Sequence, residues 1–374
     1  MKLICEKAKL EEAIAYCGKA VSPRSPLPIL NHLLFKAEKK KLRISATDLE
    51  LGIEYELAVE GKDSGAFTAP AKIIAEIVSS LPQGQVVLET LDGQLKISSH
   101  NSEFSISTLS PDEFPHLPHP EGLPVLKIPA ATLKDMLKSI SFACAAAEET
   151  RAILTGVLFS LNENILTMVA TDSRRLAKME RNINQLFPEK TQSVVPARSL
   201  NELNKLLKDG EKEVEIAFGE GQIFFSSDNL FVLSRVLEGQ FPDYQPLLRK
   251  DFNSKAIVSR PEFLSAVKRA MITAQEKQNP GMVKLSFDEN QMEATSNTPD
   301  LGQTRESVPV KLEGAGMAIA FNGRYLLDVL NNLDCEEIGV ELRDPHTSAT
   351  LVDPKDPNYL YLIMPIRIRE EVYS

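Results

Sequence analysis

One helix pattern occurs three times in this chain at equal spacing. Its basic residue stands at Lys72, Arg198 and Arg324, positions that are 126 residues apart. Apolar residues recur at i, i+3 and i+7 in every copy, as expected of a helix that packs on one face. Single amphipathic helices are common, but three copies at one interval indicate an internal repeat that governs the whole fold.

A second helix pattern opens each repeat. Six helices are therefore predicted, at residues 7–20, 71–81, 131–143, 198–208, 261–273 and 323–333. Segments with alternating apolar and β-branched residues lie between them and predict strands. In the second repeat, 156–161 and 165–172 are predicted as two such strands joined by a turn. The fold class expected is α+β, with three tandem domains that each pack two helices on antiparallel sheets.

Proline-rich segments close the first two repeats, at Glu113–Pro118 and Gln240–Pro246. Because exposed linkers favour this composition, we predict domains at residues 1–122, 123–249 and 250–374, with 369–374 as a C-terminal extension. An Ala-Thr-Asp triplet ends at Asp48 in the first repeat and at Asp172 in the second. This match indicates that the two aspartates cap turns at equivalent sites.

Charge and cysteine content argue against several classes of function. The chain starts with charged residues rather than with the apolar core of a signal peptide, and no apolar run approaches the ~18 residues of a membrane span, so we expect a cytoplasmic protein. Four cysteines lack the spacing of a zinc site or a disulfide framework, and no metal or cofactor is expected. The net charge of −10 argues against coating of nucleic acid by bulk attraction, so any DNA contact must be local.

The predicted helices differ in charge from the rest of the chain. They hold 12 Lys and Arg against 7 Asp and Glu, a net charge of +5, which leaves −15 for the other residues. Lys and Arg also favour helices by intrinsic propensity, so the excess has two explanations. A basic helical surface on an acidic protein suits loose, sequence-independent attraction to phosphates.

Three motifs make the repeat specific, at Val169–Leu176, Gly239–Tyr244 and Tyr361–Ile368. With the repeat, they make essentially the whole chain resemble the bacterial DNA polymerase III beta subunit family of replicative sliding clamps. The resemblance implies a non-catalytic, head-to-tail homodimer that forms a ring around double-stranded DNA, with helices lining the hole. It also implies partners that dock on one pocket: the polymerase III alpha subunit, the clamp loader, and other polymerases and repair proteins.

The resemblance also assigns site residues by position. Basic residues expected at the DNA are Arg24, Lys134, Lys138, Arg151, Arg198, Lys205, Lys268 and Arg269. Residues expected in a partner pocket between the second and third domains are Leu154, Thr171, Ser173, Arg174, Arg175, Leu176, Pro242, Leu247, Ser348, Leu362, Ile363, Met364, Pro365, Ile366 and Arg367. Residues expected at the dimer interface are Lys72, Ile73, Ile74, Phe104, Ile106, Met271 and Ile272.

The residue types of the pocket suit this role. Aliphatic side chains and the adaptable Met364 can bury short apolar anchors from many partners, and Arg175 can pair with a peptide acid or carbonyl. Ser173 and Arg174 differ from the small residue and the histidine that are usual in the family, which bears on partner preference. The terminal segment is expected to form a last strand as well.

An enzyme, for instance a nuclease or a phosphotransferase, is the alternative from another class. The sequence has neither the G-x-x-x-x-G-K-[ST] phosphate loop nor the H-E-x-x-H zinc motif. His116 and His119 are candidate metal ligands, but they lie in a proline-rich segment that is more simply explained as a linker. A non-ring scaffold with the same peptide groove is the second alternative, and the oligomeric state separates it from a clamp.

Overall fold

The structure is a computed structural model that describes most of the chain. Outside the described residues lie 23–26, 62, 92, 149–150, 209, 211–212, 249–250, 275–280, 299–300 and 368–374, together with the side chains of 188 and 189. Two predictions concern residues outside the described part of the chain: the DNA contact of Arg24 and the extension at 369–374. In the described part, no helix combines the length and the apolar character that crossing a bilayer requires.

The described chain forms two compact units. Unit 1 comprises Met1–Leu133 and Arg198–Val236, and unit 2 comprises Lys134–Ala197 and Leu237–Ser374. All six predicted helices are confirmed, as α1 (Lys7–Cys17), α2 (Ala71–Ser80), α3 (Ala130–Ile140), α4 (Ala197–Leu206), α5 (Arg260–Thr273) and α6 (Gly323–Asn332). Single 3-10 turns extend the first helix to Ala20 and the third to Ala143.

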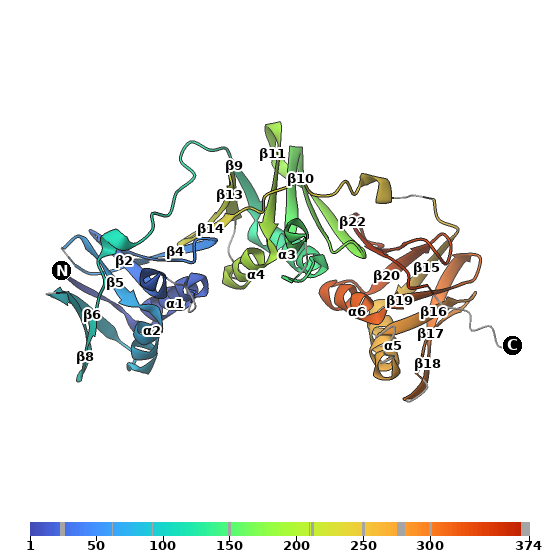
Figure 1. The fold of residues 1–374 in the computed structure, drawn as a ribbon, viewed down its shortest axis with the longest axis horizontal. Helices are drawn as coiled ribbons and strands as arrows, with labels where there is room; N and C mark the ends of the chain where they lie inside the picture. Colours follow the sequence, from blue (N-terminus) through green and yellow to red (C-terminus); the bar gives the residue numbers. More distant parts are fainter. Residues whose placement is uncertain are drawn as a thin grey trace. The chain divides into compact units, whose positions relative to one another are not determined.

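Unit 1 contains two antiparallel sheets. The smaller sheet has the strand order β1 (Lys2–Glu6), β6 (Gln85–Leu91), β7 (Gln94–Ser99) and β8 (Ser102–Ser107). The larger has the order β5 (Gly65–Pro70), β2 (His32–Glu38), β3 (Lys41–Thr47), β4 (Leu51–Ala58), β14 (Leu230–Arg235), β13 (Gln222–Ser227), β12 (Glu213–Gly219) and β9 (Val125–Pro129). Helix α1 contacts α2 and packs on β3 and β4, so the helices cover one side of the strands (Figure 1).

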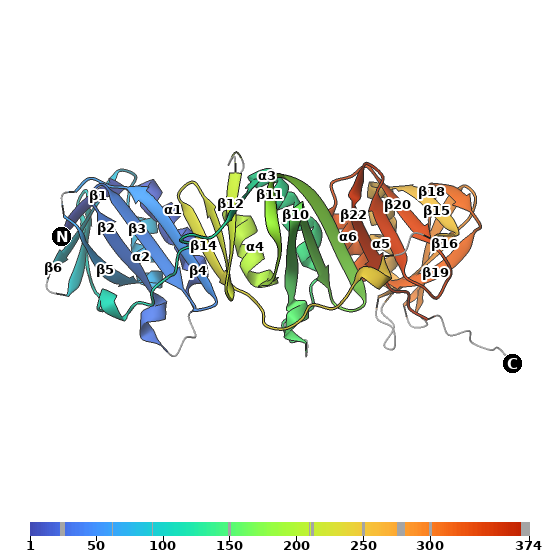
Figure 2. The ribbon, with the colours of Figure 1, turned by 90° about the horizontal axis from the view of Figure 1, so that it is seen from above.

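Unit 2 contains one antiparallel sheet of ten strands. Its order is β10 (Gly156–Thr171), β11 (Arg175–Pro196), β22 (Asp356–Ile363), β21 (Ala349–Asp353), β20 (Glu337–Leu342), β15 (Ser254–Ser259), β18 (Gly302–Gly314), β17 (Gln291–Thr298), β16 (Met282–Phe287) and β19 (Met317–Asn322). Helix α5 packs against α6 and on β17 and β18. Figure 2 shows β22, β20, β15 and β16 following one another across this sheet.

The helices bury the apolar stripe that the sequence predicts. In α2 the buried residues include Ile74, Ile77 and Val78, and Ile74 is fully inaccessible. The exposed residues of α2 are polar, as in other helices packed on one side, with the exception of Ile73. Ile74 therefore belongs to the core of unit 1, and its predicted place at a dimer interface is corrected: a side chain with no exposed surface cannot contact a partner directly.

One strand prediction in the second repeat is wrong. The two predicted strands, 156–161 and 165–172, are one strand, β10 (Gly156–Thr171), rather than two strands joined by a turn. The ladder with β11 shifts register around Glu163, whose φ of 53° breaks the alternation. The long partner β11 continues past this bulge and holds both halves in one strand, which the local pattern alone cannot reveal.

Each unit contains one strand junction that joins different repeats. Strand β4 of the first repeat pairs with β14, the last strand of the second repeat. In unit 2, β11 of the second repeat pairs in the same way with β22, the last strand of the third. Two strands equivalent to these have no such junction: β8, the last strand of the first repeat, and residues 302–309 of β18 in the third repeat. Among the described residues, β8 pairs only with β7, and residues 302–309 pair only with β17.

Candidate functional site

A tight turn at Thr171–Arg175 forms the centre of the predicted pocket. Asp172 Oδ1 accepts hydrogen bonds from the backbone N–H groups of Arg174 at 2.9 Å and Arg175 at 3.0 Å. Thr171 Oγ1 accepts one from the N–H of Ser173, which has the left-handed φ of 74°. Side-chain acceptors of this kind fix a turn and tolerate the unusual backbone of a non-glycine residue.

The first repeat contains the same turn. Asp48 Oδ1 accepts from the N–H groups of Glu50 at 3.0 Å and Leu51 at 2.8 Å, and Thr47 Oγ1 accepts from Leu49. Leu49 has a φ of 75°, nearly that of its counterpart in the second repeat. The predicted turn-capping role of the two aspartates is confirmed, and it explains why the triplet recurs.

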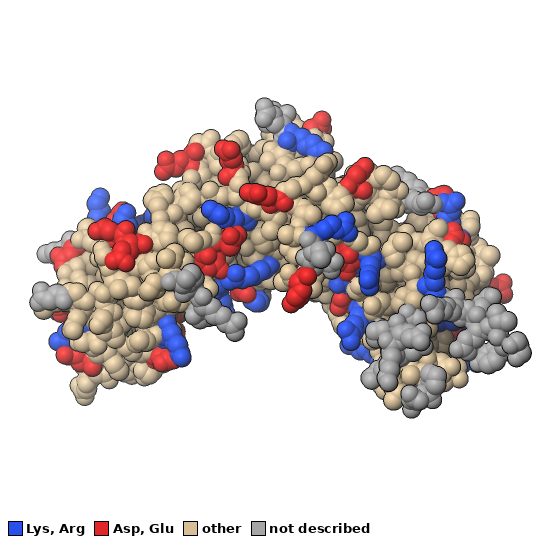
Figure 3. Space-filling model, viewed as in Figure 1, with Lys and Arg blue, Asp and Glu red and all other residues tan. Residues whose placement is uncertain are grey.

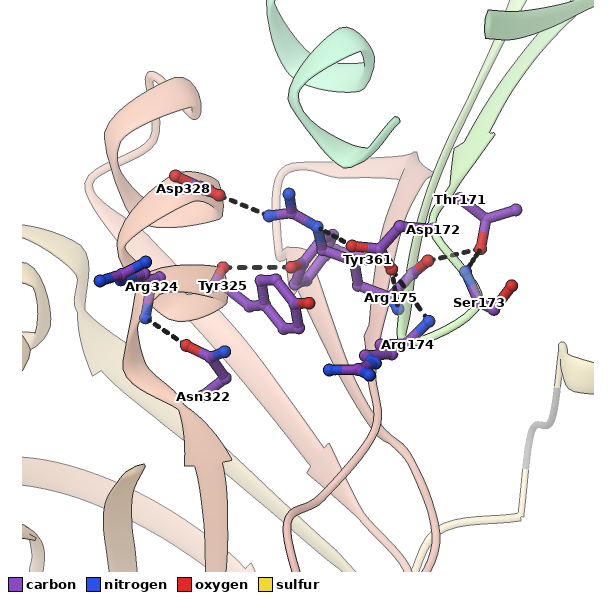
Figure 4. A network of polar contacts seen from close by, with 10 residues as sticks. All are labelled: Thr171, Asp172, Ser173, Arg174, Arg175, Asn322, Arg324, Tyr325, Asp328 and Tyr361. Atoms are coloured by element: carbon purple, nitrogen blue, oxygen red, sulfur yellow. Dashed lines mark hydrogen bonds and ion pairs between the residues drawn. The ribbon is translucent and has the colours of Figure 1, made fainter. Parts of the chain in front are cut away.

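Arg175 is the most constrained charge in this region. Its Nε lies 3.0 Å from Asp172 Oδ2 and its Nη1 lies 2.5 Å from Asp328 Oδ2, while its guanidinium stacks 4.3 Å over the Tyr325 ring (Figure 4). Burial lowers the pKa of Arg175, but Tyr361, Asp328 and Asp172 outweigh burial and raise it above its ordinary value. The guanidinium already binds two carboxylates of the chain, so its contact with a peptide stays a prediction.

An apolar cluster lies beside this turn. Its buried members are Leu158, Val169, Leu176, Val194 and Leu362, and partly buried Ile153, Leu237, Phe241, Tyr244, Leu248 and Leu360 pack against it. Leu176 and Leu362 were predicted for the pocket, and they face each other across the β11–β22 pairing. Phe241, Tyr244 and Leu248 were not among the residues predicted for the pocket, although the first two belong to the Gly239–Tyr244 motif.

The strand that ends at Ile363 brings further predicted residues to the turn. The N–H of Met364 donates to the Arg174 carbonyl at 2.9 Å, and Ser348 precedes the residue that pairs with Ile363. Met364 and Leu247 are half exposed, whereas Ile363 and Leu154 are buried. Pro242, Pro365 and Ile366 are partly exposed, and Arg367 is exposed. The residues predicted for the pocket thus combine buried apolar side chains with an accessible methionine.

Ion pairs engage four of the residues predicted to face DNA. They join Lys138 to Asp334, Arg198 to Asp48, Lys205 to Glu202 and Arg269 to Glu306. Arg151 Nη2 donates to Ser173 Oγ at 2.6 Å, and Lys268 is exposed. Lys and Arg are interspersed with Asp and Glu on the face drawn in Figure 3. The DNA contacts of these residues, Lys134 included, stay predictions.

Apart from the buried Ile74, the residues predicted for a dimer interface are accessible, some in each unit. Phe104 and Ile106 are partly exposed on the edge strand β8. Ile73 on α2 and Ile272 on α5 are exposed to 45% and 68%, which is unusual for isoleucine. Lys72 is exposed and Met271 is partly exposed.

Comparison with known proteins decides which family has this architecture. Three models of the DNA polymerase III beta subunit match consecutive parts of the chain: the N-terminal domain at 1–118, the central domain at 127–243 and the C-terminal domain at 245–367. The chain belongs to the DNA polymerase III beta subunit family. It therefore has the function of a beta sliding clamp, the non-catalytic processivity factor of DNA polymerase III, which confirms the predicted family and function.

Individual clamps match over nearly the whole chain. The beta sliding clamp of Staphylococcus aureus is 33% identical over 359 residues, which cover 93% of this chain and 94% of the relative. That of Synechococcus elongatus is 32% identical over 376 residues, covering 99% and 100%. The crystal structure of the Bacillus subtilis clamp superposes with a TM-score of 0.94 at 32% identity, covering 98% of this chain and 99% of that chain. The predicted α+β class with three clamp domains is confirmed.

His119, a candidate metal ligand, contacts side chains of the larger sheet of unit 1, and the cysteines are candidate reactive groups of the clamp. His119 stacks on Phe231, and its Nε2 lies 3.1 Å from Glu54 Oε2, so the first linker is held against the β4–β14 junction. Among the described residues, no three His, Cys, Asp or Glu side chains come together as metal ligands. Burial raises the pKa of the Cys5 and Cys144 thiols to about 12.

Proposed function

We propose that two copies of this clamp close head to tail into a ring that encircles double-stranded DNA. The ring tethers the polymerase III alpha subunit, and it binds the clamp loader and other polymerases and repair proteins through one peptide pocket per chain. Domains at 1–122, 123–249 and 250–374 form its segments, and the ring acts in the cytoplasm. DNA and polymerase III are the partners that the family implies.

The strand junctions carry this proposal. Strand β4 pairs with β14 in unit 1 and β11 pairs with β22 in unit 2, so the same kind of contact occurs twice within one chain. The third pair of equivalent edge strands consists of β18, in the third repeat, and β8, in the first repeat. The two strands therefore belong to the last and the first repeat of the chain. A heterologous contact between β18 of one copy and β8 of a second copy uses both edges and closes the assembly with two copies.

The charge of the helices supports a DNA-facing role. The six α-helices carry 11 Lys and Arg against 7 Asp and Glu, a net charge of +4 in a chain of net charge −10. An excess of this size attracts phosphates without reading sequence. Because several of these cations are already paired with acids, the attraction is loose, which suits a protein that slides.

The turn and the apolar cluster support the peptide pocket. Leu176 and Leu362 form a buried floor, and the half-exposed Met364 stands beside the turn at Arg174. Floors of this kind bury aliphatic or aromatic anchors of a peptide, and the thioether adapts to different anchors. One pocket can thus serve many partners in turn.

The test is the solution mass of the purified protein, determined together with negative-stain imaging. Twice 41.4 kDa and a closed ring are the expected result. A mass of 41.4 kDa with an open particle would favour a non-ring scaffold that keeps the peptide groove.

A further inference from the structure

The two equivalent strand junctions differ in what covers them. In the β4–β14 junction, Gly52 pairs with Leu233. In the β11–β22 junction, the pair at the same distance from the capped turn is Leu176 and Leu362. Gly52 has no side chain, and Leu117 of the first linker lies in the space above it: a Cβ atom at Gly52 would come within 2.9 Å of Leu117 Cδ2. The linker therefore supplies the leucine that the strand lacks.

The linkers of the two repeats are buried to different degrees. In Figure 2 the first linker crosses β4 and β14, and its Phe114 and Leu117 are buried. Leu117 belongs to an apolar cluster with residues of β12, β13 and β14. The matching residues of the second linker, Phe241 and Tyr244, are partly exposed. The first linker is thus seated in its junction more deeply than the second.

A polar clasp holds the end of the first linker. The Nε2 atom of His119 lies 3.1 Å from Glu54 Oε2, and the His119 ring stacks on Phe231 with the ring centroids 4.4 Å apart. Glu54 and Phe231 face each other across the β4–β14 pairing, and the pair at the same place in the β11–β22 junction is Lys178 and Leu360. Those two side chains offer neither a carboxylate nor an aromatic ring, so the second linker cannot be clasped in this way.

We propose that the groove over the β4–β14 junction is a second peptide-binding groove, and that residues 114–119 of the chain itself are its resident ligand. The proposal rests on the peptide pocket of the preceding section only through the equivalence of the two junctions. The segment has the chemistry of such a ligand, with Phe114 and Leu117 as apolar anchors. Pro115 and Pro118 restrict the free segment and so reduce the entropy lost when it docks. Because the linker fills this groove, one of the two equivalent grooves stays open to partners.

Space remains beside the resident segment. A cavity of about 310 Å³ is bordered by the linker and by the turn that Asp48 caps, and its lining includes Leu49, Pro118 and Leu233. Leu49 is exposed to 46%. A cavity of this size lies at the lower end of the range for ligand pockets. The groove therefore has the volume to accept an anchor larger than the leucine that now occupies it.

A fluorescein-labelled peptide with the sequence of residues 113–121 tests the groove on the full-length protein. Its twin has serine in place of the leucine. Fluorescence polarisation is measured with the wild type, with Leu117→Ser, which withdraws the resident anchor, and with His119→Ala, which opens the clasp and leaves the core intact. Leu117→Ser combined with Gly52→Leu refills the space from the strand. Leu57→Ser removes a buried leucine elsewhere on β4 and controls for lost stability.

Leu117→Ser should bind the linker peptide about tenfold more tightly than the wild type, because the site for one leucine side chain becomes free. His119→Ala should show a gain of about threefold, as expected for the loss of an exposed ion pair. The twin peptide, the double variant and Leu57→Ser should show no gain. Equal binding by the wild type and both release variants would overturn the second groove, and a gain that persists in the double variant would do so too, because the peptide would then bind elsewhere.

A polymerase-derived peptide, titrated into the wild type in parallel, separates this proposal from the proposed function. Failure of that peptide to bind would contradict the open pocket at the β11–β22 junction. The response of the linker peptide to Leu117→Ser does not depend on that pocket, so it decides the β4–β14 groove in either case.

Discussion

Arg175 and Asp328 lie 153 positions apart in the chain, and their side chains meet at 2.5 Å. The contact joins the turn between β10 and β11 to helix α6, so a residue predicted for the pocket is held by a helix of another repeat. Arg175 is nearly buried, and aromatic rings lie on its guanidinium. This cation therefore helps to hold the turn, together with the backbone hydrogen bonds that Asp172 and Thr171 accept.

Arg175→Ala should destabilise the fold by about 2–3 kcal/mol, because it leaves Asp172 and Asp328 without their counter-charge. The loss is smaller than for a fully buried pair, since Asp328 is partly exposed. Urea unfolding measures the change. Arg305→Ala, which removes an exposed pair with Glu293, should cost less than about 1 kcal/mol. Equal urea unfolding midpoints for the two variants would contradict a structural role of Arg175.

Met364→Ala should weaken binding of polymerase-derived peptides about tenfold or more, because it removes the accessible apolar side chain at the pocket. The dimer mass should stay the same. Isothermal titration calorimetry with a peptide and sedimentation of the same sample separate the two effects. Unchanged peptide affinity would contradict the pocket assignment.

Ile106→Lys should convert the dimer into a monomer, because it places a charge on the edge strand β8 where we propose that a second copy pairs. Ile165→Lys, on the partly exposed middle of β10, serves as the control and should remain dimeric. Light scattering gives both masses. A dimeric Ile106→Lys protein with an unchanged melting temperature would place the interface elsewhere.

Lys268→Glu should shorten the residence of the clamp on nicked circular DNA, since it reverses an exposed charge on α5. The loss should be larger at low salt, as for other phosphate contacts. Lys284→Glu makes the same change on the exposed side of β16 and should have a smaller effect. Equal retention of the two variants would argue against α5 as a DNA-facing helix.

Alkaline pH should destabilise the protein between about pH 9 and pH 12. Burial raises the pKa of Cys5 and Cys144 from 9.0 to about 12, and that of Cys335 to about 11. Below pH 9 these thiols are protonated in the folded and in the unfolded state, so their full contribution to stability is present. As pH rises further, the thiols of the unfolded chain ionise first, and the free energy of unfolding falls. Urea midpoints across this range measure the loss, and slow thiol labelling of the folded protein at pH 8 is the companion result. A flat profile would mean that the cysteines are accessible.

The sequence by itself determined the repeat, the six helices and the two capped turns. Each depends on residues close together in the chain: a stripe at i, i+3 and i+7 requires a helix with one buried face, and an aspartate ahead of two free N–H groups folds back on them. Asp48 and Asp172 were therefore recognisable without any knowledge of what surrounds them.

Only the tertiary structure decided which distant residues meet. The same pattern that surrounds Asp48 and Asp172 leads to an ion pair with Arg198 in one case and with Arg175 in the other. The joining of β10 into one strand depended likewise on β11, and the burial of Ile74 depended on the elements packed over α2. Local periodicity determines which face of an element a residue occupies. Its contact partners depend on how remote segments pack, as the pairing of Arg175 with Asp328 shows.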